Sequence, residues 1–404
     1  MKSPHLSRRN FLGTSIGCSL MIPSMKTGLS RNEPRRNISK WDIDTPALLI
    51  DLDAMEGNIR RMSDYCSANN VGYRPHTKTT KCPEISRMQL AAGAVGICTA
   101  KVSEAEAQIK GGLTDVLITS PVSTPFKIDR LMQNRMRAPG LKTVVDNLQN
   151  VRDLAEAARN HGLVLDVLVD LNVGQDRTGV APGQPVVDFA KEILRSDGLR
   201  FRGIQAYAGS MQHVHGFEER RRRNVVTMEP AAETVRMLEN EGIEVEIFTG
   251  GGTGTYNMDH HVPDFTDGQP GSYVFMDTQY LAIGGQDTTA EHYRDFEPSL
   301  TVLTTAISKP VVESITVDAG TKAVAMDDPT PIVKGITGVS YSLSGDEHGK
   351  LAFENLSREI SLGDKLELII THCDPAVNLY DQFHCVRGDR LEAVWDITGR
   401  GMCQ

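Results

Sequence analysis

Short apolar runs alternate with amphipathic stretches of helical period between residues 45 and 280. The stretches Val151 to Asn160 and Gln184 to Arg195 have the period of helices that pack one face on a core. Asp53 is expected to cap a further helix. The apolar runs predict eight strands, which are Ala47 to Ile50, Gly72 to His76, Val95 to Thr99, Asp115 to Thr119, Thr143 to Asp146, Leu165 to Leu171, Phe201 to Tyr207 and Val245 to Thr249. Eight strand–helix units in this length predict a (β/α)8 TIM barrel.

Polar residues follow nearly every predicted strand. They are His76-Thr77-Lys78, Thr99, Thr119-Ser120, Asp146-Asn147, Asn172, Tyr207 and Thr249 to Gly252. The carboxyl ends of barrel strands surround one mouth, where barrel enzymes place their active sites. An open, doubly wound sheet is the alternative, and it would bind a ligand at a switch point. We favour the barrel because polar residues gather at so many strand ends.

Beyond residue 280 the sequence becomes rich in strand-forming runs. These runs are Leu300 to Ile307, Val311 to Ala319, Ile332 to Leu343 and Lys365 to Ile370. Turn signals such as Ser344-Gly345-Asp346 separate them. This part predicts a mostly antiparallel β domain. The expected boundaries are therefore 43–285 for the barrel and 286–404 for the β-rich C-terminal domain.

The N-terminus carries paired arginines, Arg8 and Arg9, followed by Phe11 and a short apolar run from Thr14 to Met25. This arrangement resembles a twin-arginine export signal over residues 1–30, with a polar linker over 31–42. The run is too short and too broken to cross a bilayer, so we expect no stable membrane span. A disordered basic tail is the alternative. The signal predicts a periplasmic or otherwise exported protein, and its route suits one that folds around a cofactor before export.

Charge and cysteine content narrow the function classes. The formal net charge of -9 and the aromatic content of 5% argue against a nucleic-acid-binding protein, which needs a basic face and stacking platforms. The chain has seven cysteines, and none forms a C-x-x-C pair. The spacing therefore predicts no zinc knuckle. We expect scattered buried thiols rather than a disulfide framework.

A basic cluster, Arg74 to Lys81, stands where a predicted strand ends and a helix begins. Lys78 is its candidate functional residue. A lysine amine held in a closed, apolar-walled site loses part of its hydration, so its pKa falls and it becomes a nucleophile toward carbonyl groups. A solvated basic turn is the alternative for a lone K-x-x-K.

Three further features follow predicted strands. The glycine-rich turn Thr249 to Thr255 can present several backbone N–H groups to an anion, with threonine hydroxyls as added donors. It is neither G-x-G-x-x-G nor a P-loop, and a flexible loop is the alternative. Arg177 would bind a carboxylate or phenolate oxygen at the barrel mouth, and Tyr207 would point its hydroxyl there. A surface arginine and a buried, hydrogen-bonded tyrosine are the alternatives.

The segment His372-Cys373-Asp374 follows the apolar run Leu366 to Ile370. In an extended segment residues i and i+2 project to one side. His372 and Asp374 would then face one ion while Cys373 is turned away. One imidazole and one carboxylate, completed by water, suit Mn²⁺ or Mg²⁺ rather than Zn²⁺. A bare H-x-D tripeptide also occurs by chance.

Five segments together resemble the D-threonine aldolase and D-serine dehydratase family. They are Asp44 to Asp51, Arg74 to Thr79, Gly174 to Gly179, Thr249 to Thr255 and His372 to Tyr380. The resemblance extends from about residue 40 to the C-terminus. It implies an alanine-racemase-type barrel, a β-rich C-terminal domain, pyridoxal 5'-phosphate (PLP), a divalent metal and a homodimer.

The resemblance also implies a role for each candidate. Lys78 would form the Schiff base with PLP, and His372 and Asp374 would hold the metal. Arg177 would contact the phenolic oxygen of the cofactor, and Tyr207 would approach its pyridine ring. The phosphate would be held by the loop residues Thr249, Gly250, Gly251, Gly252, Thr253 and Gly254.

The sequence leaves two candidates for the general base, His76 and a metal-bound hydroxide.

One departure from the family lies in the segment Arg74 to Lys81, which commonly reads R-P-H-x-K-x-H-K in the family. Thr80 stands where the second histidine would be. This departure affects any supporting role of that histidine and leaves Lys78 in place.

The resemblance implies an aldolase that cleaves D-β-hydroxy-α-amino acids, such as D-threonine, to glycine and an aldehyde. Within the family, His-x-Asp resembles the aldolases and His-x-Cys the D-serine dehydratases, so Asp374 favours an aldolase. A dehydratase of D-serine or D-hydroxyaspartate, or a racemase of the same fold, is the second hypothesis. A non-catalytic PLP carrier is the third, and the additional C-terminal domain argues against it.

Overall fold

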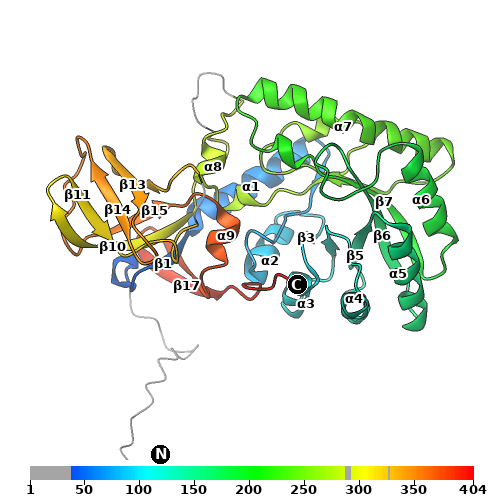
Figure 1. Ribbon diagram of the computed structural model, residues 1–404, viewed down its shortest axis with the longest axis horizontal. Coiled ribbons are helices and arrows are strands. Elements are labelled where there is room, and N and C mark those ends of the chain that lie inside the picture. Colours follow the sequence, from blue (N-terminus) through cyan, green and yellow to red (C-terminus); the bar gives the residue numbers. More distant parts are fainter. Residues whose placement is uncertain (1–37, 287–292, 326–327) are drawn as a thin grey trace, which may run out of the picture. The chain divides into compact units, whose positions relative to one another are not determined.

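The computed structural model describes residues 38–286, 293–325 and 328–404, and Figure 1 shows their arrangement. The predicted export signal and most of the predicted linker lie outside the described residues and stay predictions, as do the domain boundaries. Within the described ranges, no helix combines the length and the apolar character that a bilayer crossing needs.

Eight strands form a parallel sheet that closes on itself. Their order is β2-β9-β8-β7-β6-β5-β4-β3, and a parallel bridge between His76 and Cys98 joins the two end strands. The strands are β2 (Gly72–Tyr73), β3 (Ile97–Thr99), β4 (Val116–Ile118), β5 (Lys142–Val145), β6 (Leu165–Leu171), β7 (Leu199–Ala206), β8 (Ile247–Gly250) and β9 (Asp267–Gly268). The closure confirms the predicted barrel over the open sheet.

Helices alternate with the barrel strands and lie outside them, as α5, α6 and α7 show in Figure 1. They are α1 (Leu52–Ala68), α2 (Pro83–Ala91), α3 (Val102–Lys110), α4 (Pro125–Arg137), α5 (Leu148–Asn160), α6 (Gln184–Arg195) and α7 (Phe217–Asn240). Helix α6 has the predicted bounds. The predicted cap of α1 is wrong by two residues, because it is the Asp51 side chain that accepts a hydrogen bond from the N–H of Ala54 at 3.2 Å.

One predicted barrel strand belongs elsewhere. Strand β1 (Ala47–Asp51) pairs with β10 (Leu300–Val311) and β16 (Gln382–Arg387) in the second sheet. Its place in the barrel is taken by β9, which has two residues. A two-residue strand carries no hydrophobic period, and an apolar run does not name its partner strand. The eight-strand prediction was therefore right in number and wrong in its first member.

The second sheet is antiparallel except where β1 pairs with β16, which confirms the prediction of a mostly antiparallel part. Its other strands are β11 (Ser314–Val317), β12 (Ile332–Val333), β13 (Val339–Leu343), β14 (Gly349–Phe353), β15 (Lys365–Ile369) and β17 (Arg390–Asp396). Two short helices, α8 (Thr278–Leu281) and α9 (Cys373–Val377), lie between this sheet and the barrel (Figure 1).

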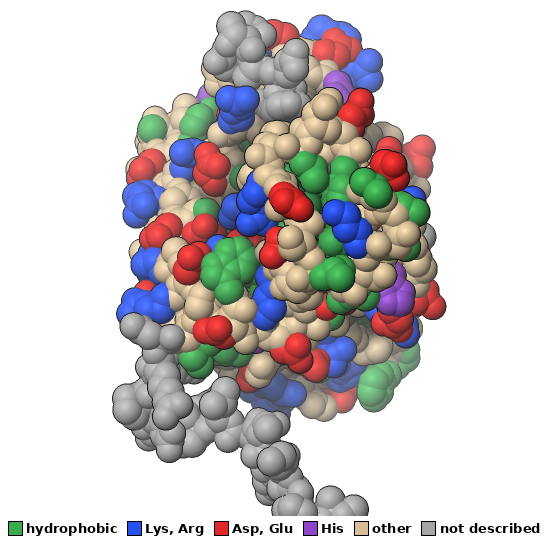
Figure 2. All heavy atoms as spheres, turned by 90° about the vertical axis from the view of Figure 1, so that its left-hand side faces the viewer, with side chains coloured by type: hydrophobic (Ala, Val, Ile, Leu, Met, Phe, Trp, Pro, Cys, Tyr) green, Lys and Arg blue, Asp and Glu red, His purple; other side chains and the backbone are tan. Residues whose placement is uncertain are grey.

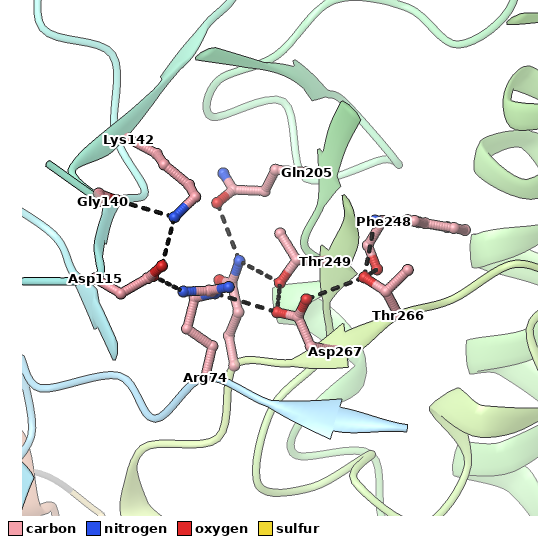
Figure 3. Close-up of polar contacts among 10 residues, drawn as sticks. Arg74, Asp115, Gly140, Lys142, Gln205, Phe248, Thr249, Thr266 and Asp267 are labelled. Carbon is pink, nitrogen blue, oxygen red and sulfur yellow. Dashed lines mark hydrogen bonds and ion pairs between the residues drawn. The ribbon is translucent and has the colours of Figure 1, made fainter. Parts of the chain in front are cut away.

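The barrel interior has an apolar layer formed by Cys98, Leu117, Val144, Leu168 and Ile247. The ion pairs drawn in Figure 3 act on the Cys98 thiol of this layer. Arg74 pairs with Asp115 and with Asp267, where Nε is 3.4 Å from Oδ1, and Lys142 donates to Asp115 at 2.8 Å. Although burial opposes the charge, the carboxylates of Asp267 and Asp115 raise the pKa of Arg74.

Replacing Arg74 by Met is expected to lower the free energy of unfolding by about 3–5 kcal/mol, because two carboxylates lose a shared buried cation. Urea unfolding followed by circular dichroism measures this change. Arg60→Met is the matched control, since Arg60 is exposed and has no ion pair with any residue that the structure describes. A midpoint for Arg74→Met equal to that of the control would contradict the structural role of the network.

Candidate active site

A cavity of about 870 Å³ lies at the carboxyl ends of the barrel strands. Residues from the barrel and from the start of α9 line it together. The predicted site residues among them are His76, Lys78, Arg177, Tyr207, Gly252, Thr253, His372 and Asp374. The predicted loop residues Thr249, Gly250, Gly251 and Gly254 are not among the lining residues. Thr249 instead donates to Asp267 at 2.8 Å, inside the barrel (Figure 3).

Lys78 follows β2 and extends toward α9. Its Nζ lies 3.2 Å from Oδ2 of Asp374, and the Thr79 hydroxyl donates to Oδ1 of the same carboxylate at 2.6 Å. The charge of Asp374 raises the pKa of Lys78 and outweighs burial, which acts in the opposite direction. The prediction of a lowered pKa is therefore wrong for this arrangement. Lys81 has a different function, because it forms a buried ion pair with Glu104 at 2.6 Å.

His76 is held by hydrogen bonds on both ring nitrogens. Nδ1 accepts from the N–H of Lys78 at 3.4 Å, so Nε2 carries the proton and donates to the Thr119 hydroxyl at 3.1 Å. Burial, together with the nearby charge of Lys78, lowers the pKa of His76 to about 3. The imidazole is therefore neutral, but neither nitrogen presents an unused lone pair to the cavity. This arrangement suits orientation of the Lys78 segment better than proton abstraction.

Arg177 and Tyr207 lie together on another wall of the cavity. The guanidinium of Arg177 is 5.6 Å from the centre of the Tyr207 ring. Burial raises the pKa of Tyr207, and the charges of Lys78 and Arg177 oppose this. Arg177 forms no ion pair within the described ranges, so its charge is available to an anionic oxygen in the cavity.

His372 and Asp374 both reach the cavity, but not from an extended segment as predicted. His372 is the last extended residue before α9, and Asp374 lies in its first turn. The chain direction changes between them and still leaves Nε2 and Oδ2 4.0 Å apart. Cys373 is turned away as predicted, with its Sγ 3.6 Å from the carbonyl oxygen of Met276.

The donor set of this pair fits a metal ion as a partial coordination shell. An imidazole and a carboxylate on one open cavity wall leave positions for water or a substrate oxygen. Among the described residues, no group of three or more histidine, cysteine, aspartate or glutamate side chains surrounds one point. His213 lines the same cavity, and burial, with the nearby charge of His372, lowers its pKa to about 4.

The chemistry of the cavity also fits PLP. Lys78 offers an amine, Arg177 an uncommitted charge, and Thr253 and Ser272 offer backbone N–H groups without acceptors in the described part of the chain. Two residues that sequence analysis missed, Gln205 and Gln269, also line the cavity and join at 3.1 Å. Gln205 is two residues before Tyr207 in the predicted strand Phe201 to Tyr207, so alternation could have indicated it, whereas Gln269 follows a strand too short to be predicted.

Comparisons with known proteins agree with this architecture. The family model "Alanine racemase, N-terminal domain" matches residues 50–279, and "Putative serine dehydratase domain" matches residues 299–386. The chain belongs to the family that joins these two domains. The alanine-racemase-type barrel followed by a mostly antiparallel β sheet is thereby shown, and this family depends on PLP.

Named relatives include aldolases. The chain is 39% identical to the 3-hydroxy-D-aspartate aldolase of Paracoccus denitrificans (strain Pd 1222), covering 98% of this chain and 99% of that protein. The crystal structure of D-threonine aldolase from Filomicrobium marinum superposes with a TM-score of 0.87 and 39% identity, covering 92% of this chain and 100% of the other.

A dehydratase is a more distant relative. The D-threo-3-hydroxyaspartate dehydratase from Delftia sp. HT23 has a TM-score of 0.75 and 27% identity, covering 89% of this chain and 98% of the other. A variant of that type of dehydratase, in which a cysteine is replaced by alanine, is described as the metal-free form.

Replacing Lys78 by Ala is expected to abolish the visible absorbance of protein-bound PLP, because the amine that would hold the cofactor is removed. Absorbance spectra after addition of PLP and desalting measure this. Lys110→Ala, an exposed lysine outside the cavity, is the control. A retained band in Lys78→Ala would assign the amine to another residue, and Lys101 also lines the cavity.

Proposed function

We propose that this protein is a PLP-dependent, metal-assisted aldolase that cleaves D-3-hydroxy-α-amino acids to glycine and an aldehyde. The observation that carries the proposal is the meeting of Lys78 with the His372 and Asp374 pair in one cavity, 3.2 Å from amine to carboxylate. The Lys78 amine and a candidate metal pair would then lie within reach of neighbouring atoms of one small substrate. The aldolase relatives support the reaction class.

Each group contributes a distinct step. PLP, when bound, supplies an electron sink for the carbanion that remains after bond cleavage. A divalent ion held by His372 and Asp374 would lower the pKa of the substrate β-hydroxyl. Lys78 would hold the cofactor through its amine, and in the free protein the neighbouring carboxylate of Asp374 raises the pKa of this amine. Arg177 supplies a fixed positive charge to an anionic oxygen in the cavity.

The choice of aldolase over dehydratase rests on Asp374 and on the relatives. A dehydratase must expel the β-hydroxyl, whereas an aldolase must deprotonate it. The chain carries Asp374 after His372, the pattern that resembles the aldolases. Its identity to the aldolase relatives is 39%, against 27% to the dehydratase.

Product analysis tests the reaction. We expect the purified protein with PLP and Mn²⁺ to convert D-threonine to glycine and acetaldehyde, and D-3-hydroxyaspartate to glycine and glyoxylate. Chromatography of the amino acids and derivatised carbonyl products measures both. Ammonia with 2-oxobutyrate or oxaloacetate would identify a dehydratase instead. Bound PLP without turnover of either substrate would contradict both enzymatic proposals and support a carrier.

The metal pair is tested separately. Asp374→Asn should retain the PLP absorbance. Its Mn²⁺-dependent turnover should fall strongly, because the loss of a residue that only supports a metal ligand already costs roughly 10- to 100-fold, and Asp374 is proposed as a ligand itself. Initial rates with and without EDTA measure the metal-dependent part. Asp381→Asn is the control, because Asp381 is 79% exposed in the same segment. Unchanged stimulation by Mn²⁺ in Asp374→Asn would rule out this carboxylate as a ligand.

A further inference from the structure

The side chains of Thr255 and Gln212 accept hydrogen bonds from the backbone of the glycine-rich loop after β8. The N–H of Gly252 donates to the Thr255 hydroxyl at 3.1 Å, and the N–H of Gly254 donates to the Gln212 side-chain oxygen at 3.0 Å. Thr253 lies between these two tethered residues and lines the cavity. Its own N–H has no acceptor among the residues that the structure describes. The tethers therefore leave one donor of the loop uncommitted at the cavity wall.

The Thr255 hydroxyl is the centre of this arrangement. It accepts from Gly252 N–H and from the Gln212 side-chain amide, each at 3.1 Å. Both acceptor positions are thus used, so its single proton must be donated, and it goes to Oδ2 of Asp259 at 2.8 Å. The carboxylate of Asp259 thereby determines the direction of every hydrogen bond at this hydroxyl.

Asp259 is itself positioned by α7. Its side chain is almost completely buried, and Oδ1 accepts from the Asn224 amide at 2.8 Å. The loop packs directly on this carboxylate, since a Cβ at Gly251 would lie 1.9 Å from Oδ2. A side chain at position 251 would therefore displace Asp259.

A buried cation lies on the same face of α7, one turn from Asn224. Arg220 is completely buried and donates to carbonyl oxygens only, including that of Gly254 at 2.7 Å. It has no carboxylate partner within the ranges described by the structure. Burial lowers the pKa of Arg220, as expected for a cation without a close counter-ion. An anion bound at the loop would supply the missing negative charge.

We propose that Asp259 is a positioning residue for the phosphate of PLP, acting through the Thr255 hydroxyl on the Gly252–Thr255 loop. The inference rests on the proposed function, because the anion is the cofactor phosphate. Asp259 does not touch the phosphate. Asp259 sets the loop geometry that directs the Thr253 N–H toward the phosphate. Arg220, which binds the carbonyl oxygen of Gly254, adds a positive potential at the loop.

Because of this position, the protonation of Asp259 is linked to the binding of PLP. Burial raises the pKa of Asp259 to about 7, against the hydrogen bonds from Asn224 and Thr255, which lower it. The ionisable groups whose pKa responds to the charge of Asp259 are Tyr65 and Cys66 on α1 and Tyr207 at the cavity, and His260 is its neighbour in the chain.

A phosphate dianion nearby disfavours the carboxylate and raises its pKa further, so PLP binding takes up a proton. Phosphate-dependent affinity is then greatest below pH 7 and falls as pH rises through the raised pKa. The Oδ1 atom of Asn224 has no partner in the described structure. If the side-chain amide of Asn224 flips, this oxygen can accept a hydrogen bond from the protonated Asp259.

The test compares dissociation constants of the apoprotein for PLP and for pyridoxal, which lacks the phosphate. The ratio of the two affinities isolates the phosphate contribution and cancels any pH effect on the amine. In the unmodified protein this ratio should fall about fivefold between pH 7 and pH 9 if the bound phosphate raises the pKa of Asp259 by about one unit. Asp259→Asn should remove this pH dependence, because an amide of the same shape does not ionise in that range. Asp264→Asn, an exposed neighbour, should behave like the unmodified protein.

A second pair of variants tests the route through the hydroxyl. Thr255→Val should lower the PLP to pyridoxal affinity ratio at every pH, and Thr255→Ser should restore it. The inference is overturned if Asp259→Asn keeps the pH dependence of the unmodified protein, or if Thr255→Val leaves the ratio unchanged. Should Asp259→Asn not fold, the Thr255 pair decides. An unmodified protein that binds no PLP would overturn the proposed function and this inference together, whereas the other outcomes leave the proposed function intact.

Discussion

The Lys78 amine and the Asp374 carboxylate are far apart in the sequence and lie 3.2 Å apart in one cavity. Thr79 binds the same carboxylate, so the two contacts connect the segment after β2 to α9. The segment that follows β15 of the second sheet thus supplies two residues of the site, His372 and Asp374. Its docking against the barrel brings a cation, a carboxylate and an imidazole within reach of one ligand. Without that docking the barrel would retain an amine but would have no metal pair.

Ion pairs inside the barrel add connections to its two shortest strands, which form few backbone hydrogen bonds. Strands β2 and β9 each have two residues and share two paired positions. Arg74, directly after β2, pairs with Asp267 on β9 and with Asp115 on the other side (Figure 3). Buried ion pairs are weak evidence for stability, because removing charge from water costs almost as much as the attraction returns. Here they join strands that few backbone hydrogen bonds connect, at the base of the segment that carries Lys78.

The surface of the molecule shows a different distribution of charge. Figure 2 presents acidic and basic side chains interspersed over the visible face, with apolar side chains scattered between them. Inside the molecule, buried charged groups gather around Asp374, Arg74 and Arg220. Against the effect of burial, Lys78 lowers the pKa of Asp374, and Asp267 and Asp115 raise that of Arg74, and all three partners come from elements distant in sequence. The cavity therefore depends on the whole fold for its chemistry, and not only on the loops that line it.

The sequence by itself determined the alternation that builds the barrel, the bounds of α6, the β-rich C-terminal part and the segments that contribute Lys78, Arg177, His372 and Asp374. Periodicity and motif spacing carry this information because they are local. Even so, of the glycine-rich segment only Gly252 and Thr253 line the cavity.

Tertiary structure alone decided the remaining points. It moved β1 to the second sheet, supplied β9, raised the pKa of Lys78 and placed Asp259 beneath the loop. An apolar run does not specify its neighbour, and two residues have no period. A pKa depends on which distant charge arrives beside the group. These properties arise from contacts between segments far apart in the chain, which no local pattern encodes.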